Sequence, residues 1–266
     1  MTTRGFDIIK AHAYGNDFLY VPQAQVDHLD LPDLTRAVCH RHTGIGADGL
    51  ILYRATPGGA VMRLFNADGS PAEVSGNGVR GLAAILTEMH GLSGELVIQT
   101  DGGEKRLTRL ESHASRHLFR AAMGAPSDIR ALDLEAAGER VHIVALWMGN
   151  PQCVVLEDRL PDDERFARLG PALERHPAFP NGTNVEFAMV EAPDRVRIVI
   201  WERGVGPTLS SGTGSCAAAV AAMHDAGAAR DLTVDAPGGA QRVEWRPDSV
   251  YLTGWAEIVL EGRWIA

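Results

Sequence analysis

The sequence predicts an α/β (α+β) protein built as two pseudo-symmetric lobes by internal duplication. Each lobe is expected to be a mostly antiparallel sheet or barrel wrapped around one central helix. Three observations predict this class. Two glycine-rich turns, at residues 75–81 and 211–214, each open an alanine-rich stretch that is apolar on nearly all sides. Each turn is preceded by the same landmarks at nearly the same spacing. The length of 266 residues suits two domains of ordinary size, each with its own core.

The first shared landmark is an aromatic residue followed by a polar one at the end of an apolar stretch. Residues 65–66 (Phe-Asn) and 201–202 (Trp-Glu) stand in this position, and each aromatic residue precedes the serine of its turn, Ser75 or Ser211, by ten positions. An apolar stretch bounded by turn residues is typical of a strand. Each turn is therefore expected to follow a strand and to open a helix.

The second shared landmark lies further upstream. Residues 7–16 resemble residues 142–150, and both segments end in Gly-Asn. Asn16 lies 59 positions before the first serine, and Asn150 lies 61 positions before the second. Landmarks in the same order at such similar spacing indicate duplication of a unit of roughly 130 residues, which is far longer than the repeat of a solenoid.

The individual elements follow from apolar runs that are bounded by turn residues. Strands are expected at residues 6–10, 18–21, 49–53, 61–66, 96–100, 118–123, 141–147, 153–156, 185–190, 196–201, 232–235 and 258–260. Helices are expected at residues 31–41, 77–89, 164–169 and 213–225. The second and fourth helices should be buried inside their own lobes, because they are apolar all round. The N-terminal lobe is then 1–124, to which a C-terminal strand at 257–266 returns, and the C-terminal lobe is 125–256.

Composition and charge argue against several classes of protein. The formal net charge of −9 does not offer the concentration of basic residues that phosphate binding needs, so a nucleic-acid partner is not expected. No segment is apolar enough to suggest a membrane span or a secretory signal. The three cysteines, Cys39, Cys153 and Cys216, show neither metal-ligand spacing nor a CxxC pair. We therefore expect a reduced, cytoplasmic protein without a metal site.

The two turns predict chemistry on a small anion. Each places a serine and several free backbone N–H groups at a helix N-terminus, which is a site for a carboxylate. If each helix N-terminus points at the other lobe, Ser75 and Ser211 would approach the carbon next to that carboxylate from opposite faces. This geometry suits stereoinversion, in which one group removes a proton and the other delivers one. A single Ser-Gly-x-Gly turn is more often only a capped helix, but two caps alone do not explain the matched spacing.

Six collinear segments resemble the diaminopimelate epimerase family. They are residues 12–18 (His-Ala-Tyr-Gly-Asn-Asp-Phe), 41–49 (Arg-His-Thr-Gly-Ile-Gly-Ala-Asp-Gly), 65–70 (Phe-Asn-Ala-Asp-Gly-Ser), 149–151 (Gly-Asn-Pro), 184–185 (Asn-Val) and 201–206 (Trp-Glu-Arg-Gly-Val-Gly). The resemblance implies an isomerase, independent of pyridoxal phosphate and without other cofactors, that interconverts L,L- and meso-diaminopimelate on the route to lysine and peptidoglycan. It also implies a homodimer. The lysine content agrees, because a pyridoxal phosphate Schiff base would need Lys10 or Lys105, and neither lies in a phosphate-cradling context.

The resemblance also assigns roles to polar residues. Those that would hold the distal amino-acid end of the substrate are Asn66, Asn150, Asn184 and Arg203. Glu202 would face the amino groups, and Asn16 would lie near the reacting end. The residues of the two turns that would contact substrate are Gly76, Asn77, Gly212 and Thr213. One guanidinium and three amides can hold a carboxylate, and Glu202 can balance an ammonium. Without the resemblance, asparagines near glycine are usually turn residues, and this reading is strongest for Asn184.

Three positions depart from the family. Ser75 and Ser211 stand where the family has the two cysteines that act as base and acid, and Gln152 stands where it usually has histidine. A helix N-terminus lowers a thiol pKa from about 8.5 toward neutrality, but a serine hydroxyl starts far higher, and the same shift leaves it protonated. Glutamine cannot titrate, so it cannot supply the missing base. Cys216, five positions after Ser211 in the helix, is expected in the core.

Several interpretations of the two serines stay open. In the first interpretation, the serines are deliberate replacements of cysteine that let the site hold substrate without turnover. In the second, they mark a natural serine-bearing branch of the family. Gln152 supports the second interpretation, as does Pro207, where the family often has glutamate. A third interpretation is a racemase or isomerase of another amino acid that uses a different base. A fourth is a catalytically disarmed homologue that only binds diaminopimelate. A phenazine-biosynthesis-like isomerase shares the duplicated fold but relies on a carboxylate, which neither serine provides.

Overall fold

The computed structural model describes residues 5–265, and the chain divides into two compact units. Unit 1 comprises Met1–Ala121 and Trp255–Ala266, and unit 2 comprises Ala122–Gly254. The chain passes from unit 1 to unit 2 within strand β8 (Arg116–Gly124) and returns within strand β17 (Val250–Ile265). The sequence placed these crossings at 124/125 and 256/257.

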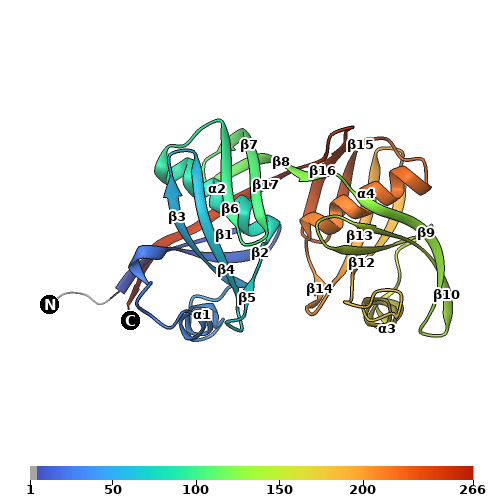
Figure 1. Ribbon diagram of the computed structural model, residues 1–266, viewed down its shortest axis with the longest axis horizontal. Coiled ribbons are helices and arrows are strands. Elements are labelled where there is room, and N and C mark those ends of the chain that lie inside the picture. The colour runs from blue at the N-terminus through green and yellow to red at the C-terminus, as the bar shows by residue number, and fades with distance from the viewer. Residues whose placement is uncertain (1–4, 266) are drawn as a thin grey trace. The chain divides into compact units, whose positions relative to one another are not determined.

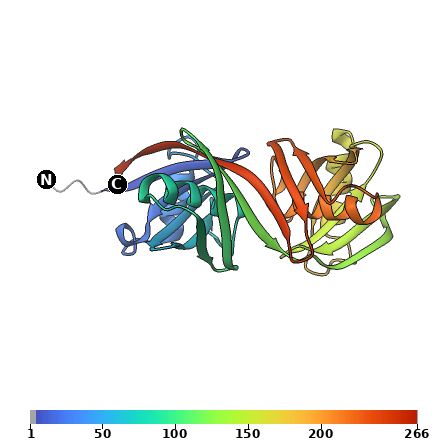
Figure 2. The same ribbon diagram turned by 90° about the horizontal axis from the view of Figure 1, so that it is seen from above.

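Unit 1 is a mostly antiparallel sheet with one helix on each face. Its remaining strands are β1 (Gly5–Ala13), β2 (Asn16–Pro22), β3 (Gly49–Thr56), β4 (Gly59–Asn66), β5 (Pro71–Ala72), β6 (Glu95–Thr100) and β7 (Gly103–His113). Its helices are the 3-10 helix η1 (Gln23–Gln25), α1 (Leu31–Cys39) and α2 (Gly76–His90). The pairs β2–β3 and β4–β6 are parallel. Figure 2 shows β17 running beside β1, and the register of this antiparallel pair extends from Gly5 opposite Ile265 to His12 opposite Glu257.

Unit 2 repeats this arrangement. Its strands, besides the first part of β17, are β9 (Ser127–Ala136), β10 (Glu139–Trp147), β11 (Pro151–Leu156), β12 (Asn184–Ala192), β13 (Arg195–Glu202), β14 (Gly206–Thr208), β15 (Asp231–Ala236) and β16 (Gly239–Trp245). Its helices are α3 (Asp163–Glu174) and α4 (Gly212–Asp225). The parallel pairs are β11–β12, joined through α3, and β13–β15, joined through α4. The equivalent pairs of unit 1 are joined through α1 and α2, so the order of elements confirms the predicted duplication.

The central helices, α2 and α4, are buried along most of their length. In α2 every residue from position 77 to position 87 is buried, and in α4 residues 217–222 have no exposed surface. Alanine occupies five of the six positions 217–222, and glycine or alanine four of the eleven positions 77–87, so strands can approach the helices closely at these small residues. Figure 1 shows α2 against the strands of unit 1 and α4 against the strands of unit 2. The predicted fold class, a sheet wrapped around a central helix in each half, is confirmed.

Alternation along the strands gives each unit two cores. In β3, Ile51 packs with Leu82 and Ile85 of α2, whereas Leu50 packs with Val38 of α1. Successive side chains of a strand point to opposite faces, so α1 and α2 cover the two faces of the same sheet. The sheet of unit 2 has the same layout between α3 and α4.

The sequence prediction missed the short strands β5 and β14, the strands β7, β9 and β16, and the first half of β17. In β7 and β9 few positions are buried, and charged residues occupy half of the rest, so the apolar runs that predict strands are absent. The prediction for β17 covered only 258–260, which belongs to its more exposed half. Helix α3 also continues beyond the predicted end at 169, through Pro171 to Glu174.

We expect α2 to depend on its contact with Tyr20. The Tyr20 hydroxyl donates a hydrogen bond to the Gly78 carbonyl oxygen at 2.9 Å in the core, and a Cβ at Gly81 would overlap with that hydroxyl. Gly81→Ala should therefore lower the free energy of unfolding by about 1–3 kcal/mol through over-packing. Tyr20→Phe should lower it by about 0.5–1.5 kcal/mol through loss of the hydrogen bond.

The double variant separates these effects, because phenylalanine lacks the oxygen that alanine would meet. Its loss of stability in denaturant unfolding should be smaller than the sum of the two single losses, as expected for residues in contact. Strict additivity would show that the Gly81 methyl group is accommodated without meeting Tyr20.

Candidate active site

The two predicted serines occupy the same structural position in their units. Ser75 is the N-cap of α2, with φ −128° and ψ 124°, and its Oγ accepts a hydrogen bond from the Gly78 backbone N–H at 3.2 Å. Ser211 is the N-cap of α4, with φ −135° and ψ 126°, and its Oγ accepts from the Gly214 N–H at 3.2 Å. Each serine satisfies one of the N–H groups that a helix N-terminus leaves unpaired. The positive end of the helix dipole favours negative charge at this place.

In unit 1 the turn at Ser75 is tied to the start of β2. The side chain of Asn77 donates to Asn16 Oδ1 at 3.2 Å, and Asn16 Nδ2 donates to Asp48 Oδ2 at 2.8 Å. Asn66 lies at the end of β4, opposite Gly49 in the register of the β3–β4 pair, and its side chain donates to Ser70 Oγ at 3.1 Å. The structure therefore joins Asn16 and Asn77 directly and places Asn66 beside the strand that follows Asp48.

Four charged residues next to Asn16 form a network of ion pairs: Lys10, Asp17, Arg41 and Asp48. Asp17 is buried and pairs with Lys10 Nζ at 2.8 Å and with Arg41 at 3.1 Å, and Arg41 also pairs with Asp48 at 2.7 Å. Burial alone would raise the pKa of Asp17, but the hydrogen bonds from Lys10 and Arg41 outweigh it and hold the pKa below its usual value. Lys10 also donates to the Gly46 carbonyl at 2.6 Å. Its ammonium group is thus engaged in holding this corner of unit 1.

In unit 2 the predicted residues gather where β11 and β12 begin. Gln152 lies opposite Asn184 in the parallel register of this pair, and one amide atom of Gln152 lies 2.5 Å from Asn150 Oδ1. Asn184 Oδ1 accepts from the Arg203 backbone N–H at 3.0 Å. The structure thereby brings Asn150, Gln152 and Asn184 together and connects them to the turn that carries Arg203.

The turn at 202–204 is anchored by a residue that the sequence reasoning missed. Glu174, buried at the end of α3, accepts from Trp201 Nε1 at 2.8 Å and from the Gly204 N–H at 2.9 Å. Glu202 Oε1 accepts from the Thr208 hydroxyl at 3.0 Å, and the exposed Arg203 donates to the Asn181 carbonyl at 3.1 Å. These contacts hold the backbone on both sides of the turn and leave the Arg203 guanidinium at the surface.

A second missed residue, Glu186, lies under the start of α4. It is the third residue of β12 and has no exposed surface. Burial, and secondarily the charge of Glu202, raise its pKa well above the usual carboxyl value. A signal was present in the sequence, because Glu186 is an ionisable residue inside the apolar strand predicted at 185–190.

The amide of Gln152 connects Glu186 to the rest of this group. The Gln152 amide atom on the Glu186 side lies 3.0 and 3.2 Å from the two carboxyl oxygens, and the other lies 3.3 Å from Asn184 Nδ2 and 3.2 Å from Thr213 Oγ1. The nitrogen and the oxygen of this amide are assigned from whether the neighbouring groups donate or accept hydrogen bonds. Gln152 thus links Glu186 to Thr213, Asn150 and Asn184 in one polar network.

The three cysteines belong to the hydrophobic cores of the two units. All are buried, and Cys216 has no exposed surface and belongs to the core around α4, as expected. Burial raises the pKa of Cys39 to about 12, and it raises the pKa of Cys153 well above the usual thiol value. Neither Cys39 nor Cys153 is set up as a thiolate at neutral pH.

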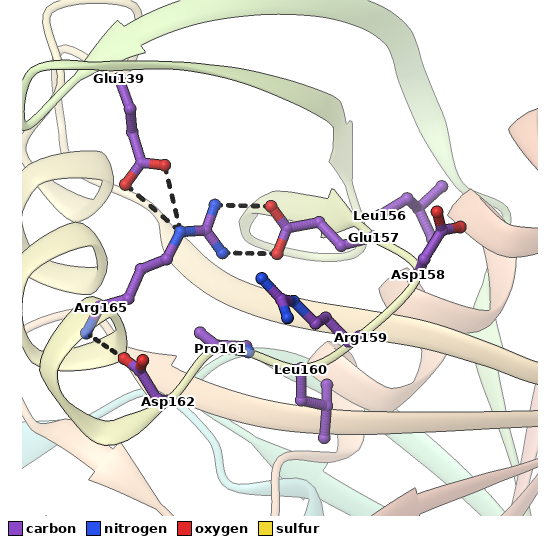
Figure 3. Close-up of a pocket in the computed structure, with 9 residues that line it drawn as sticks. All are labelled: Glu139, Leu156, Glu157, Asp158, Arg159, Leu160, Pro161, Asp162 and Arg165. Carbon is purple, nitrogen blue, oxygen red and sulfur yellow. Dashed lines mark hydrogen bonds and ion pairs between the residues drawn. The ribbon is translucent and has the colours of Figure 1, made fainter.

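One cavity of unit 2 contains no predicted site residue. It has a volume of about 670 Å³ and lies beside the first turn of α3 in unit 2. Figure 3 shows Arg165 on one side of this cavity, held by Glu157 through contacts of 2.6 and 2.5 Å and by Glu139 at 3.1 Å. These ion pairs tie α3 to the ends of β10 and β11, so we assign them a structural role. Within residues 5–265 no cluster of histidine, cysteine and carboxylate residues could hold a metal ion, and no helix has the length and hydropathy to cross a membrane.

Solved structures place the fold among epimerases and related isomerases. A predicted epimerase from Pseudomonas aeruginosa superposes with a TM-score of 0.74 at 13% identity, over 98% of this chain and 99% of that chain. A hydroxyproline epimerase from Agrobacterium vitis gives a TM-score of 0.71 at 16% identity, over 98% and 93% of the two chains. At these identities the likeness defines the fold alone.

Sequence comparison defines the family. The family model for diaminopimelate epimerase matches residues 8–128 and 144–259. The diaminopimelate epimerase of Desulfitobacterium hafniense is 39% identical over 284 aligned positions, which cover 96% of this chain and 97% of the relative. That of Desulforudis audaxviator is 41% identical over 278 positions, covering 97% and 99%. The chain belongs to the diaminopimelate epimerase family, as the motifs predicted.

Glu174→Gln tests whether this buried carboxylate anchors the turn at 202–204. Burial opposes its charge, but the hydrogen bonds from Trp201 and Gly204 outweigh burial and lower its pKa. The variant should lose about 1.5–3 kcal/mol of stability at pH 7, the range for hydrogen bonds to a charged group. That stabilisation is complete above the usual glutamate pKa of about 4.3, and it disappears as the pH falls through the lower folded value. The deficit relative to the parent should therefore shrink in acid.

Denaturant unfolding followed by tryptophan fluorescence measures this effect, because Trp201 is itself a partner. Glu164→Gln, an exposed change in the first turn of the same helix, is the matched control and should cost only a few tenths of a kcal/mol. A deficit in Glu174→Gln that is the same at pH 3 and pH 7 would contradict the proposed anchor.

Proposed function

We propose that this chain interconverts L,L- and meso-diaminopimelate by two-base proton transfer at the α-carbon, without a cofactor. The observation that carries this proposal is the pair of N-cap serines, Ser75 and Ser211, which have matching backbone angles and matching hydrogen bonds in two duplicated units. A two-base inversion needs two proton-transfer groups of the same kind, and duplication supplies one from each unit.

Each turn offers donors for the charge that develops when the α-proton leaves. Backbone N–H groups of Gly76, Gly212 and Thr213, next to the Gly78 and Gly214 N–H groups that the serines cap, lie at helix N-termini, where backbone dipoles stabilise a carboxylate and the enolate-like charge next to it. These donors are fixed by the helices before the substrate arrives. They therefore stabilise the transition state without reorganising.

The distal end of the substrate is assigned to the polar residues named by the resemblance. Arg203, with Asn66, Asn150 and Asn184, would hold the distal carboxylate, and Glu202 would balance the distal ammonium. Asn16, joined to Asn77 beside Ser75, would lie near the reacting centre. A substrate with only one amino-acid end would leave these polar groups unpaired, so the set favours a diamino dicarboxylate over a simple amino acid.

The serines limit the rate in this proposal. A hydroxyl has a far higher pKa than a thiol, and a helix N-terminus shifts it by only a few units at most. The chain should bind diaminopimelate with the full set of polar residues but turn it over slowly. We further propose, on the family resemblance, that it works as a cytoplasmic homodimer, and the net charge of −9 supports the absence of a nucleic-acid partner.

Ser75→Cys combined with Ser211→Cys tests the rate limit. Thiols at the two N-caps reach the thiolate state near neutral pH, so turnover of L,L-diaminopimelate should rise by orders of magnitude. Proton NMR in D2O would follow loss of the α-proton signal and appearance of the meso isomer. Ser93→Cys with Ser127→Cys adds two exposed thiols outside the turns and should leave the rate unchanged.

Binding is tested separately by calorimetry with meso-diaminopimelate. Heat of binding is expected for the parent chain, and Arg203→Ala should weaken the affinity by about 2–5 kcal/mol, as when a paired charge loses its partner. Absence of binding at millimolar ligand would exclude the proposed substrate. Binding without exchange, in the parent and in the double cysteine variant alike, would instead indicate a binding protein.

A further inference from the structure

The duplication makes the surroundings of the two serines directly comparable. In the parallel pair β2–β3 of unit 1, Phe18 lies opposite Gly49 and Tyr20 opposite Ile51. In the equivalent pair β11–β12 of unit 2, Gln152 lies opposite Asn184 and Val154 opposite Glu186. Two apolar residues of unit 1, Phe18 and Ile51, therefore correspond to Gln152 and Glu186 in unit 2.

These positions lie directly under the two serine turns. An ideal Cβ on Gly78 would lie 2.7 Å from Ile51 Cδ1, 3.4 Å from Ser75 Cβ and 3.6 Å from Phe18 Cε2. An ideal Cβ on Gly214 would lie 2.5 Å from Glu186 Oε1 and 3.1 Å from Ser211 Oγ. The third helical residue is glycine in both units, so the side chain from the strand reaches the space beside the serine. That space is bordered by hydrocarbon at Ser75 and by a carboxyl group at Ser211.

The hydrogen bonds open to the Gln152 amide depend on the protonation state of Glu186, because an ionised carboxylate can only accept. When Gln152 Nε2 donates to Asn150 Oδ1 at 2.5 Å, its oxygen faces the Glu186 carboxyl, which must then carry a proton to donate. When the amide is reversed, Nε2 donates to both oxygens of the ionised carboxylate, and the oxygen accepts from Asn184 Nδ2 and Thr213 Oγ1. The same oxygen then lies 2.5 Å from the Asn150 side chain, whose amide must reverse with it to donate. The protonation state of Glu186 thus affects the hydrogen bonds of Asn150 and Asn184, the side chains assigned to substrate binding.

We propose that Glu186 is a positioning residue that receives the hydroxyl proton of Ser211 when this serine removes the substrate α-proton, and that Gln152 couples that transfer to Asn150 and Asn184. This inference rests on the proposed function. It makes the Ser211 side the one that removes a proton most readily in this chain.

The proton transfers balance. As the α-proton passes to Ser211 Oγ, the serine's own proton passes to a Glu186 oxygen, so Ser211 remains a hydroxyl and the negative charge moves from the carboxylate to the substrate. Return of the proton to the same face reverses both transfers. Inversion requires Ser75 to deliver its hydroxyl proton to the other face and then to recover one from water, without a carboxyl at the positions of Phe18 and Ile51. Glu186 must then release its proton to the hydroxide that remains, which restores both groups. Exchange on the Ser211 side should therefore outpace epimerisation.

The electrostatic surroundings of Glu186 suit this role. Ionisable groups that interact with it are Glu202 on β13 and Cys153 on β11, and the first turn of α4 (Gly212, Thr213, Gly214 and Ser215) carries no titratable side chain. Burial and Glu202 both raise the pKa of Glu186, which moves a carboxyl toward the working pH, where a proton acceptor is most effective. Helix α3 packs against the opposite face of the sheet, in the core that contains Val185 and Phe187.

The first experiment uses the resting protein and needs no turnover. Carbon NMR of the Glu186 carboxyl and nitrogen NMR of the Gln152 side-chain amide should titrate with one common midpoint above the usual glutamate range. Ser211→Ala should shift that midpoint, whereas Ser75→Ala should leave it in place. A Gln152 amide that does not respond to the Glu186 titration would overturn the coupling, whether or not the chain is an epimerase.

The second experiment measures α-proton exchange of L,L- and meso-diaminopimelate in D2O as a function of pH. Glu186→Gln should slow exchange by on the order of 10²–10⁴-fold, the usual contribution of a proton acceptor, and should abolish the rise of the rate with pH. Glu191→Gln, an exposed change on the same strand, is the matched control and should keep the parent profile. Equal rates and pH profiles in Glu186→Gln and the parent would sink the proposal.

Folding of Glu186→Gln is checked by its stability, which also has an expected pH dependence. The folded pKa of Glu186 is raised, so the folded state binds more protons than the unfolded state above the usual glutamate pKa, and the parent loses stability as the pH rises through that window. Glu186→Gln should lack this loss and should gain stability relative to the parent at alkaline pH. If the parent shows neither binding nor exchange, the proposed function fails, and the NMR titration alone decides the pairing of Glu186 with Ser211.

Discussion

Each unit depends on burying one helix along almost its whole length. The core around α2 or α4 can close only because these helices carry small and apolar side chains where strands cross them, and because each N-terminus receives a serine cap. A buried helix cannot leave its first N–H groups without partners at low cost. The serine satisfies one of them, and the remaining donors favour an anion. The feature that allows the core to close is therefore the same feature that creates a binding place for a carboxylate.

The parts of the fold that follow from this burial could be predicted from the sequence. The turns at Ser75 and Ser211 marked where α2 and α4 begin, because cap, glycine and apolar run coincide there. Strands β7 and β9 could not be found in this way. Most of their side chains are exposed and many are charged, so their pairing comes from backbone hydrogen bonds to neighbouring strands, which leave little pattern in the sequence. The start of β17 was missed for another reason: residues that precede the predicted strand lie in the core of unit 2, and nothing in the local sequence indicates which unit a strand will join.

The candidate site likewise contains residues that the sequence predicted and residues that only the tertiary structure reveals. The motifs supplied Asn16, Asn150, Asn184 and Arg203, and the structure joins Asn184 to the backbone of Arg203 by a hydrogen bond. Glu174 and Glu186 were missed because their importance is tertiary. Glu174 acts on a turn that lies thirty residues further along the chain, and Glu186 becomes notable only when β12 is seen under the first turn of α4. A charge inside an apolar strand was the one visible sign, and its meaning depends on the glycine at 214 that lets the carboxyl approach.

Duplication alone would not serve a two-base reaction. In each direction one group must accept a proton while its counterpart holds one to donate, and two groups in identical environments have the same pKa and the same protonation state. Environments that push the pKa values of paired groups apart are what separate base from acid. The two turns are alike in backbone, cap and helix, so the difference has to come from what lies beneath them. Phe18 and Ile51 on one side and Gln152 and Glu186 on the other supply that difference. Duplication preserves the positions of the two proton-transfer groups, and divergence at these two strand positions makes one of the two groups the better proton acceptor.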